Sequence, residues 1–108
     1  MRYEIILAPE AAEDLQCLKA SVRAEVRDAI ERHLRHEPTK TSKARIKRLR
    51  GLSRPQYRLR VGGDIRVFYD VPEDTVEVLA IVPKSEAKDW LERDGDSDEE
   101  GTSDPTEG

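Results

Sequence analysis

Cysteine, aromatic residues and long apolar runs are scarce in this sequence. The single cysteine, Cys17, excludes an intramolecular disulfide, and its spacing among apolar residues predicts a small buried hydrophobe rather than a nucleophile. No stretch has the apolar length that spans a bilayer. The first residues, Met1–Glu4, lack the charged and then apolar pattern of a secretory signal. These absences predict a cytoplasmic protein.

Acidic residues are absent from the middle of the chain and abundant at its end. From Lys40 to Arg60 there are nine Lys and Arg and no Asp or Glu, which favours a polyanion as partner. Residues 1–91 have a net charge of +3, although the whole chain has −4. Residues 92–108 hold eight acidic residues and no aromatic or β-branched aliphatic residue, which is too little apolar surface to offset the entropy of ordering. We predict one folded domain at residues 1–92 and a disordered acidic tail at residues 93–108.

Two alternating runs around a turn predict a β-hairpin, formed by Tyr57–Val61, the turn Gly62–Asp64 and Ile65–Tyr69. Slipping one strand by one residue moves its side chains to the other face, so the loop length decides which residues lie together. A two-residue loop would place Arg66 opposite an apolar residue and mix charge into both faces. A three-residue loop places Arg60 opposite Arg66 and leaves one face apolar, and its glycines allow a positive φ. We adopt this loop, and the other face then carries Arg58, Arg60, Arg66 and Phe68.

The N-terminal part of the chain predicts one strand and two helices. The apolar, β-branched stretch Tyr3–Leu7 is typical of a strand, and Pro9 suits the first position of a short helix that ends near Leu18. Ser21 can cap a second helix, in which apolar residues recur every four positions until Pro38. Both helices have one apolar stripe, so they are expected to pack on each other and on a sheet.

The C-terminal part adds a strand and a helix. Thr75–Val82 is apolar on both faces after Glu77, as in a central strand, and Lys84–Leu91 has the composition of a short helix. The basic segment Thr39–Ser53 is expected to be ordered but irregular. We therefore predict an α+β fold. Its small antiparallel sheet, made of the N-terminal strand and a C-terminal three-stranded meander, packs against the two N-terminal helices, with a short C-terminal helix.

Several short motifs follow one another in a distinctive order. After a strand and two amphipathic helices come Arg-Leu-Arg-Gly-Leu at Arg48–Leu52, the two runs of the hairpin, and a last strand that ends Val82-Pro83-Lys84. This order resembles the RelE/ParE superfamily of bacterial type II toxins over about residues 2–91. The resemblance implies a toxin made alongside a cognate antitoxin protein. In the RelE branch it implies cleavage of ribosome-bound mRNA by the RNA's own 2′-hydroxyl, without a metal, and in the ParE branch inhibition of DNA gyrase.

The same resemblance assigns catalytic roles to four cations. Arg58 and Arg60 match a basic pair on one strand, Arg66 matches an arginine of the next strand, and Lys84 matches a basic residue after the last strand. Ser85 stands where members of known activity usually have arginine, and the last helix lacks the Tyr or His that several members use in proton transfer. Arginine suits the phosphate because its planar fork grips two oxygens. Lys84 could act as a base only where neighbouring charge or burial favours its neutral form.

Further nucleic-acid contacts are predicted in the basic segment and at one aromatic residue. Phe68 shares the cationic face and is able to stack a base, although burial under the last helix is an open alternative. The basic segment either positions phosphate or forms a flexible loop. His33 and His36 have no Cys near them and are expected at the surface, not in a metal site. The predicted contacts are Lys43, Lys47, Arg48, Arg50 and Phe68.

Three classes of function remain open. The basic cluster favours a metal-independent endoribonuclease toxin with no cofactor, whose partners are an antitoxin and ribosome-bound mRNA. Ser85 and the missing aromatic residue favour a toxin of the same fold directed at a protein such as gyrase. The third class is a non-catalytic nucleic-acid-binding or regulatory module.

Overall fold

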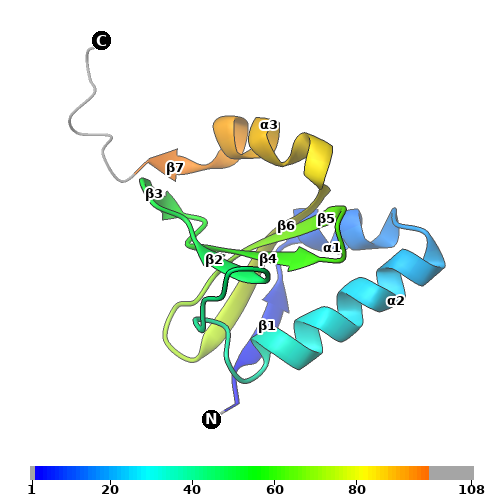
Figure 1. The fold of residues 1–108 in the computed structure, drawn as a ribbon, viewed down its shortest axis with the longest axis horizontal. Helices are drawn as coiled ribbons and strands as arrows, with labels where there is room; N and C mark the ends of the chain where they lie inside the picture. Colours follow the sequence, from blue (N-terminus) through cyan, green and yellow to red (C-terminus); the bar gives the residue numbers. More distant parts are fainter. Residues whose placement is uncertain (1, 98–108) are drawn as a thin grey trace.

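A five-stranded sheet with helices on both faces forms the body of the protein in the computed structural model, which describes residues 2–97 (Figure 1). The elements follow in the order β1 (Glu4–Leu7), α1 (Pro9–Gln16), α2 (Ala20–Ala29), the π-helical turn η1 (Ile30–Leu34), β2 (Ile46–Arg48), β3 (Leu52–Arg54), β4 (Tyr57–Val61), β5 (Ile65–Asp70), β6 (Thr75–Pro83), α3 (Lys84–Asp94) and β7 (Asp96–Ser97). The predicted α+β class is confirmed.

The strand order of the sheet is β1-β6-β5-β4-β2. Strand β1 runs parallel to β6, and the other neighbours are antiparallel, so the sheet is mixed instead of wholly antiparallel. The hairpin register is the predicted one, with Arg60 opposite Arg66 and Val61 opposite Ile65. Gly62 has φ +59°, the left-handed conformation for which glycine is suited. The alternation of side chains thus puts the apolar and cationic sets on opposite faces, as predicted.

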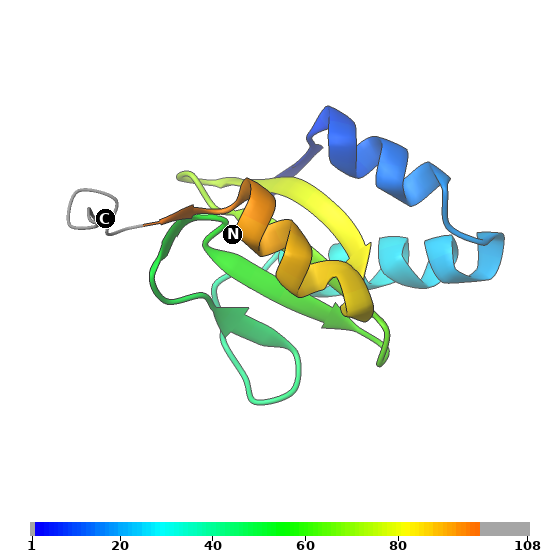
Figure 2. The same ribbon diagram turned by 90° about the horizontal axis from the view of Figure 1, so that it is seen from above.

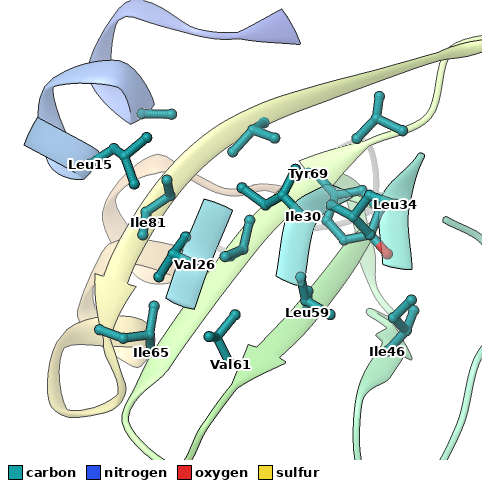
Figure 3. Packing of buried hydrophobic residues seen from close by; sticks show 14 residues of the cluster. Leu15, Val26, Ile30, Leu34, Ile46, Leu59, Val61, Ile65, Tyr69 and Ile81 are labelled. Carbon is teal, nitrogen blue, oxygen red and sulfur yellow. The ribbon is translucent and has the colours of Figure 1, made fainter. Parts of the chain in front are cut away.

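Two separate apolar clusters lie on the two faces of the sheet. On one face, α2 and η1 contribute Val26, Ile30 and Leu34, which face the sheet residues Leu59 and Tyr69 (Figure 3). On the other face lies α3, seen in Figure 2 in front of the strands. Its cluster consists of Phe68, Leu79, Ala80, Val82 and Trp90. The cationic residues of the hairpin share the face that α3 partly covers.

Helix α1 protects the part of β6 that β1 does not reach. Strand β1 ends at Leu7, beside Val78, whereas β6 continues to Pro83. The backbone N–H of Ile81 donates instead to the Asp14 carboxylate of α1, at 3.0 Å. Burial raises the pKa of Asp14, the hydrogen bond from Ile81 opposes this rise, and the nearby Glu10, Glu13 and Glu86 add to it. A side chain therefore replaces a neighbouring strand at this edge.

A buried tyrosine ties the loop after η1 to the sheet. The Tyr69 hydroxyl donates to the carbonyl of Pro38 at 2.6 Å. Its ring stacks on Tyr57, with centroids 5.5 Å apart, so the predicted pairing of these tyrosines on the core face is confirmed. Burial, and secondarily Tyr57, raises the pKa of Tyr69.

Two local predictions in the N-terminal half are wrong. Helix α2 begins at Ala20 with Lys19 as its N-cap, and no side chain bonds to this end, so Ser21 is not the cap. Cys17 is exposed, because it follows α1 in the link to α2 and does not share the stripe of Ala11 and Leu15 that faces the sheet.

The basic segment and the start of the tail are more regular than predicted. Within Thr39–Ser53, β2 pairs with β4, and the short β3 pairs with β7. Helix α3 extends past the predicted domain boundary at residue 92 to Asp94, and its last turn continues to Gly95, whose N–H donates to Leu91 O at 2.9 Å. Residues 93–97 of the predicted tail thus continue α3 and, at Asp96 and Ser97, form β7, which pairs with β3. Residues 98–108 of the predicted tail lie outside the described residues.

Candidate nucleic-acid interface

Four cations lie across three adjacent strands on one face of the sheet. Lys47 of β2 is opposite Arg58 of β4, which is opposite Phe68 of β5. In the next row, Arg60 of β4 is opposite Arg66 of β5. We call Lys47, Arg58, Arg60 and Arg66 the cationic sheet face. Among residues 2–97, none of these four side chains forms an ion pair with a carboxylate.

The three arginines differ strongly in exposure. Arg60 is exposed, Arg58 is half-buried, and Arg66 is only 4% exposed. Arg66 Nη1 donates to the carbonyls of Gly63 at 3.3 Å and Ile65 at 3.2 Å, which fixes the hairpin turn. Arg66 therefore lies beneath the surface of this face and not open to solvent.

Burial and the repulsion of neighbouring cations disfavour the charges of Arg58 and Arg66. Burial lowers the pKa of Arg58, and Arg66 and Arg60 lower it further. Burial also lowers the pKa of Arg66, with a further contribution from Arg60 that the carboxylate of Asp64 opposes. The Nε atom of Arg58 is buried without a hydrogen-bond partner among the described residues. An anionic oxygen beside Arg58 and Arg60 would offset the repulsion between these charges.

Phe68 is not free to stack a base. It is 1% exposed, and its ring lies parallel to that of Trp90 in α3, with centroids 5.0 Å apart and an angle of 5° between the planes. Its assignment as a nucleic-acid contact is corrected, and the alternative of burial under the last helix holds. Register placed Phe68 on the cationic face correctly, but only the position of α3 decides what covers it.

Lys84 is the exposed first residue of α3, at the hairpin-turn end of the cationic sheet face. Its backbone N–H donates to the carbonyl of Asp64 at 2.6 Å, which joins α3 to the turn. A shallow hollow at this point is lined by Asp64, Pro83, Lys84 and Ser85. The structure thus brings Lys84 to the same end of the sheet as Arg60 and Arg66.

The other predicted contacts of the basic segment separate into two kinds. Lys43 and Arg50 are exposed before and after β2, and Lys47 belongs to the cationic sheet face. Arg48 has an internal role, since its Nη1 donates to Gln56 O at 2.8 Å. Its guanidinium also lies 5.3 Å from the ring centroid of Tyr57. Arg48 therefore supports the bend between β2 and β4.

One exposed cation was missed by sequence reasoning. Arg45 directly precedes β2, and its carbonyl accepts the N–H of Arg60 at 2.9 Å, so it continues the row of Arg60 and Arg66. The alternation of Arg45 with Lys47 was the available signal. Arg54, in contrast, lies 3.6 Å from Asp70 and 3.9 Å from Glu77 and is thus neutralised.

Searches for a metal site and for a membrane span found neither within residues 2–97. No group of three or more His, Cys, Asp or Glu side chains is arranged to hold an ion. His33 is half-buried, and burial lowers its pKa, as do Arg45 and Arg32. No helix in the described part of the chain combines the length and apolarity needed to cross a bilayer.

Comparison with known proteins identifies the class of this fold. The structure superposes on a double mutant of the toxin RelE from Escherichia coli in the free state, with a TM-score of 0.67 and 20% identity, covering 85% of this chain and 93% of that chain. It also matches the toxin–antitoxin complex RelBE2 of Mycobacterium tuberculosis (TM-score 0.62, 23% identity, 78% and 100% covered) and the archaeal RelE–RelB complex of Pyrococcus horikoshii (0.55, 27%, 78% and 97%). The fold is therefore that of the RelE-like toxins.

The sequence itself defines the family. Residues 5–88 match the family described as the ParE toxin of type II toxin–antitoxin system, parDE. The chain therefore belongs to this family, within the RelE/ParE superfamily, and is a type II toxin. No curated protein matches the sequence.

Proposed function

We propose that this toxin cleaves ribosome-bound mRNA in the cytoplasm and that the cationic sheet face binds the scissile phosphate. One observation carries the proposal: Arg58, Arg60 and Arg66 lie together without a carboxylate partner among residues 2–97, and Arg58 Nε lacks any acceptor there. Unpaired and partly buried cations are costly in a protein that has no anionic ligand. A phosphate diester supplies the missing negative charge.

The cleavage proposed is an internal transfer at phosphorus. The 2′-oxygen of one nucleotide attacks the adjacent phosphorus, and the bond from phosphorus to the 5′-oxygen breaks. The products are a 2′,3′-cyclic phosphate and a free 5′-hydroxyl. The proton of the 2′-hydroxyl passes to water, and a proton is given to the leaving 5′-oxygen. No metal or cofactor enters the proposal.

Each cation has a distinct role in this reaction. The exposed Arg60 binds the non-bridging oxygens first, and the half-buried Arg58 adds its positive charge beside them. The positive charge of Arg66, which lies below the surface, stabilises the negative charge that develops on the phosphate. Arg66 also fixes the hairpin turn by donating to the carbonyls of Gly63 and Ile65. Lys84, at the mouth of the hollow beside Asp64, protonates the leaving oxygen.

Gyrase is the second candidate target. It is favoured by the cover that α3 places over Phe68, by the burial of Arg66, and by Ser85 at the position of the expected arginine. In this case the cationic sheet face and the outer side of α3 would form an interface with a protein. A toxin of this second kind needs no proton-transfer residue.

Induced expression in bacteria separates these targets. Rapid arrest of translation with site-specific mRNA ends that carry a 5′-hydroxyl is the expected result, whereas an SOS-type DNA-damage response indicates gyrase. No growth defect would indicate a non-catalytic binding module. Arg60→Ala should abolish the mRNA ends. Arg23→Ala is the matched control, because this arginine of α2 donates to Gln16 O at the end of α1.

An antitoxin protein is the proposed cellular partner. Its support is the family and the fold, since solved relatives of this fold are complexes of RelE with RelB. We expect an acidic or amphipathic segment of the antitoxin to cover the cationic sheet face, with association that weakens as salt rises. The measurement is co-purification of the protein encoded by an adjacent reading frame at low and high salt.

A further inference from the structure

The turn of the β4–β5 hairpin and the start of α3 form the two walls of one hollow (Figure 2). Ile65 is opposite Pro83 at the end of the ladder between β5 and β6. The bond from Lys84 N–H to Asp64 O, at 2.6 Å, extends this ladder by one residue. Asp64 and Lys84 therefore lie opposite each other, one on each wall.

The Asp64 side chain belongs to the same face of the sheet as the cations. Asp64 precedes Arg66 by two residues, and the bond to Lys84 keeps it in line with β5, so both side chains point to one face. The charge of Asp64 reaches Arg66, because this carboxylate opposes the lowering of the pKa of Arg66. Asp64 is also the only Asp or Glu from Thr39 to Tyr69. One carboxylate thus lies among the cations that are proposed to hold the phosphate.

Asp64 and Lys84 lie opposite each other and yet do not pair. Both are exposed, and neither forms an ion pair within residues 2–97. Opposite residues on paired segments have Cβ atoms about 4.5–5.5 Å apart, which is close enough for an acid and a base to join. The hollow between them instead has a free volume of about 450 Å³, within the range of small-ligand sites. A carboxylate and an ammonium thus face one space in which a ribose and its phosphate fit.

The proposed cleavage needs two proton transfers on opposite sides of the phosphorus. The 2′-oxygen enters opposite to the leaving 5′-oxygen, so a base is required on one side and an acid on the other. The arginines cannot act as the base, because a guanidinium stays protonated. An ionised carboxylate only accepts, and that of Asp64 lies on the wall opposite Lys84, the group that protonates the leaving oxygen. The two walls of the hollow therefore carry the base and the acid.

We propose that Asp64 is the general base of the cleavage. Its carboxylate takes the proton of the 2′-hydroxyl while the 2′-oxygen forms its bond to phosphorus. The electron pair of the broken bond goes to the 5′-oxygen, which takes a proton from the Lys84 ammonium. Asp64 then releases its proton to water, and Lys84 regains one from water. This inference rests on the proposed cleavage of mRNA and adds the group that activates the attacking oxygen.

Single-turnover cleavage of mRNA on programmed ribosomes tests this role. Asp64→Asn should slow cleavage by roughly 10²- to 10⁴-fold, the usual contribution of a general base, and should not weaken binding, because it removes a negative charge. Asp64→Glu keeps a carboxylate and should recover part of the rate. Both variants should fold like wild type, since Asp64 is exposed and its bond to Lys84 uses the backbone carbonyl. Glu73→Gln, the same kind of change in the exposed turn at the other end of β5, should cleave like wild type.

An mRNA with sulfur in place of the 5′-oxygen at the cleaved bond separates the base from the acid. Sulfur leaves without a proton, so this substrate should restore cleavage by Lys84→Ala and leave Asp64→Asn slow. Restored cleavage by Asp64→Asn would overturn its role as base and make Asp64 a positioning residue for Lys84. Equal rates for wild type and Asp64→Asn on the natural mRNA would overturn this inference alone. If wild type itself does not cleave, the proposed function fails and this inference with it.

Discussion

The indole ring of Trp90 lies flat on the ring of Phe68, and this contact holds α3 against the face of the sheet that carries Arg66. The indole N–H also donates to Glu10 Oε2 of α1, at 3.2 Å. One side chain thus connects the last helix to the sheet and to the first helix.

Trp90→Ala should loosen α3 and destabilise the fold by about 3–5 kcal/mol, the usual cost of removing a large buried aromatic side chain. Trp90→Phe is the matched control, because it keeps the stack on Phe68 and loses only the bond to Glu10. The measurement is urea unfolding of both variants together with amide exchange along α3. A similar loss for the two variants would show that the bond to Glu10, and not the stack, holds the helix.

Arg66→Ala should reduce cleavage of mRNA by roughly 10²- to 10³-fold, as the loss of one stabilising donor typically does. Because Arg66 is buried and bonded to Gly63 and Ile65, the substitution should also lower the free energy of unfolding. Arg66→Lys should restore activity only in part, since the ammonium lacks the planar fork. The measurement is single-turnover cleavage on programmed ribosomes, beside urea unfolding of each variant. Equal cleavage by folded wild type and Arg66→Ala would remove Arg66 from the site.

Asp14→Ala should destabilise the fold by about 1–3 kcal/mol, because the Ile81 N–H loses its acceptor at the edge of β6. Asp14→Asn keeps an acceptor and removes the charge. The pKa of Asp14 is raised in the folded state, so the native protein holds this proton more tightly than the unfolded chain does. Stability from this group is therefore present below its ordinary pKa of 3.8 and falls as the pH rises through the folded pKa.

Asp14→Asn should consequently remove the fall in stability that wild type shows as the pH rises. The variant should unfold at a higher urea concentration than wild type at pH 7 and at the same concentration at pH 3. Urea titrations across this pH range are the measurement. If Asp14→Asn were less stable than wild type at pH 7, the hydrogen bond from Ile81 to the charged carboxylate would contribute more free energy than the burial of that charge costs.

Tyr69→Phe should lower the free energy of unfolding by about 1–2 kcal/mol, since the carbonyl of Pro38 loses its buried donor. Tyr57→Phe is the control, because the stacking of the two rings is kept in both variants. Thermal unfolding of the pair should show the loss for Tyr69 alone. Equal melting temperatures would mean that water takes the place of the hydroxyl.

The register of the hairpin could be predicted from the sequence, because side chains alternate between the two faces of a strand and the length of the turn then determines which residues lie opposite each other. It could not give the burial of Phe68, since this depends on α3 returning across the sheet from Pro83. Nor could it give that of Arg66, whose guanidinium bonds to the carbonyls of Gly63 and Ile65. The alternation of β4 and β5 is the same whether that face is covered or open. Likewise, the sequence shows Asp14 only as a favourable charge near the start of a helix. Its role as acceptor for Ile81 follows from β6 extending beyond the end of β1, which the sequence does not reveal.

The position of β6 affects how this toxin emerges from the ribosome that makes it. Among residues 2–97, β6 is the last long strand in sequence and lies between β1 and β5. Strand β1 therefore has no strand to pair with until β6 is made, when Glu4 pairs with Thr75. Before β6 is made, β2, β4 and β5 form at most a three-stranded part of the sheet, and a hairpin such as β4 and β5 is marginal by itself in water. The nascent polypeptide therefore cannot assemble its sheet until residue 83 is released from the exit tunnel, and translation products that stop before β6 should be harmless. The ribosome must therefore synthesise the chain beyond β6 before the toxin can fold and become active.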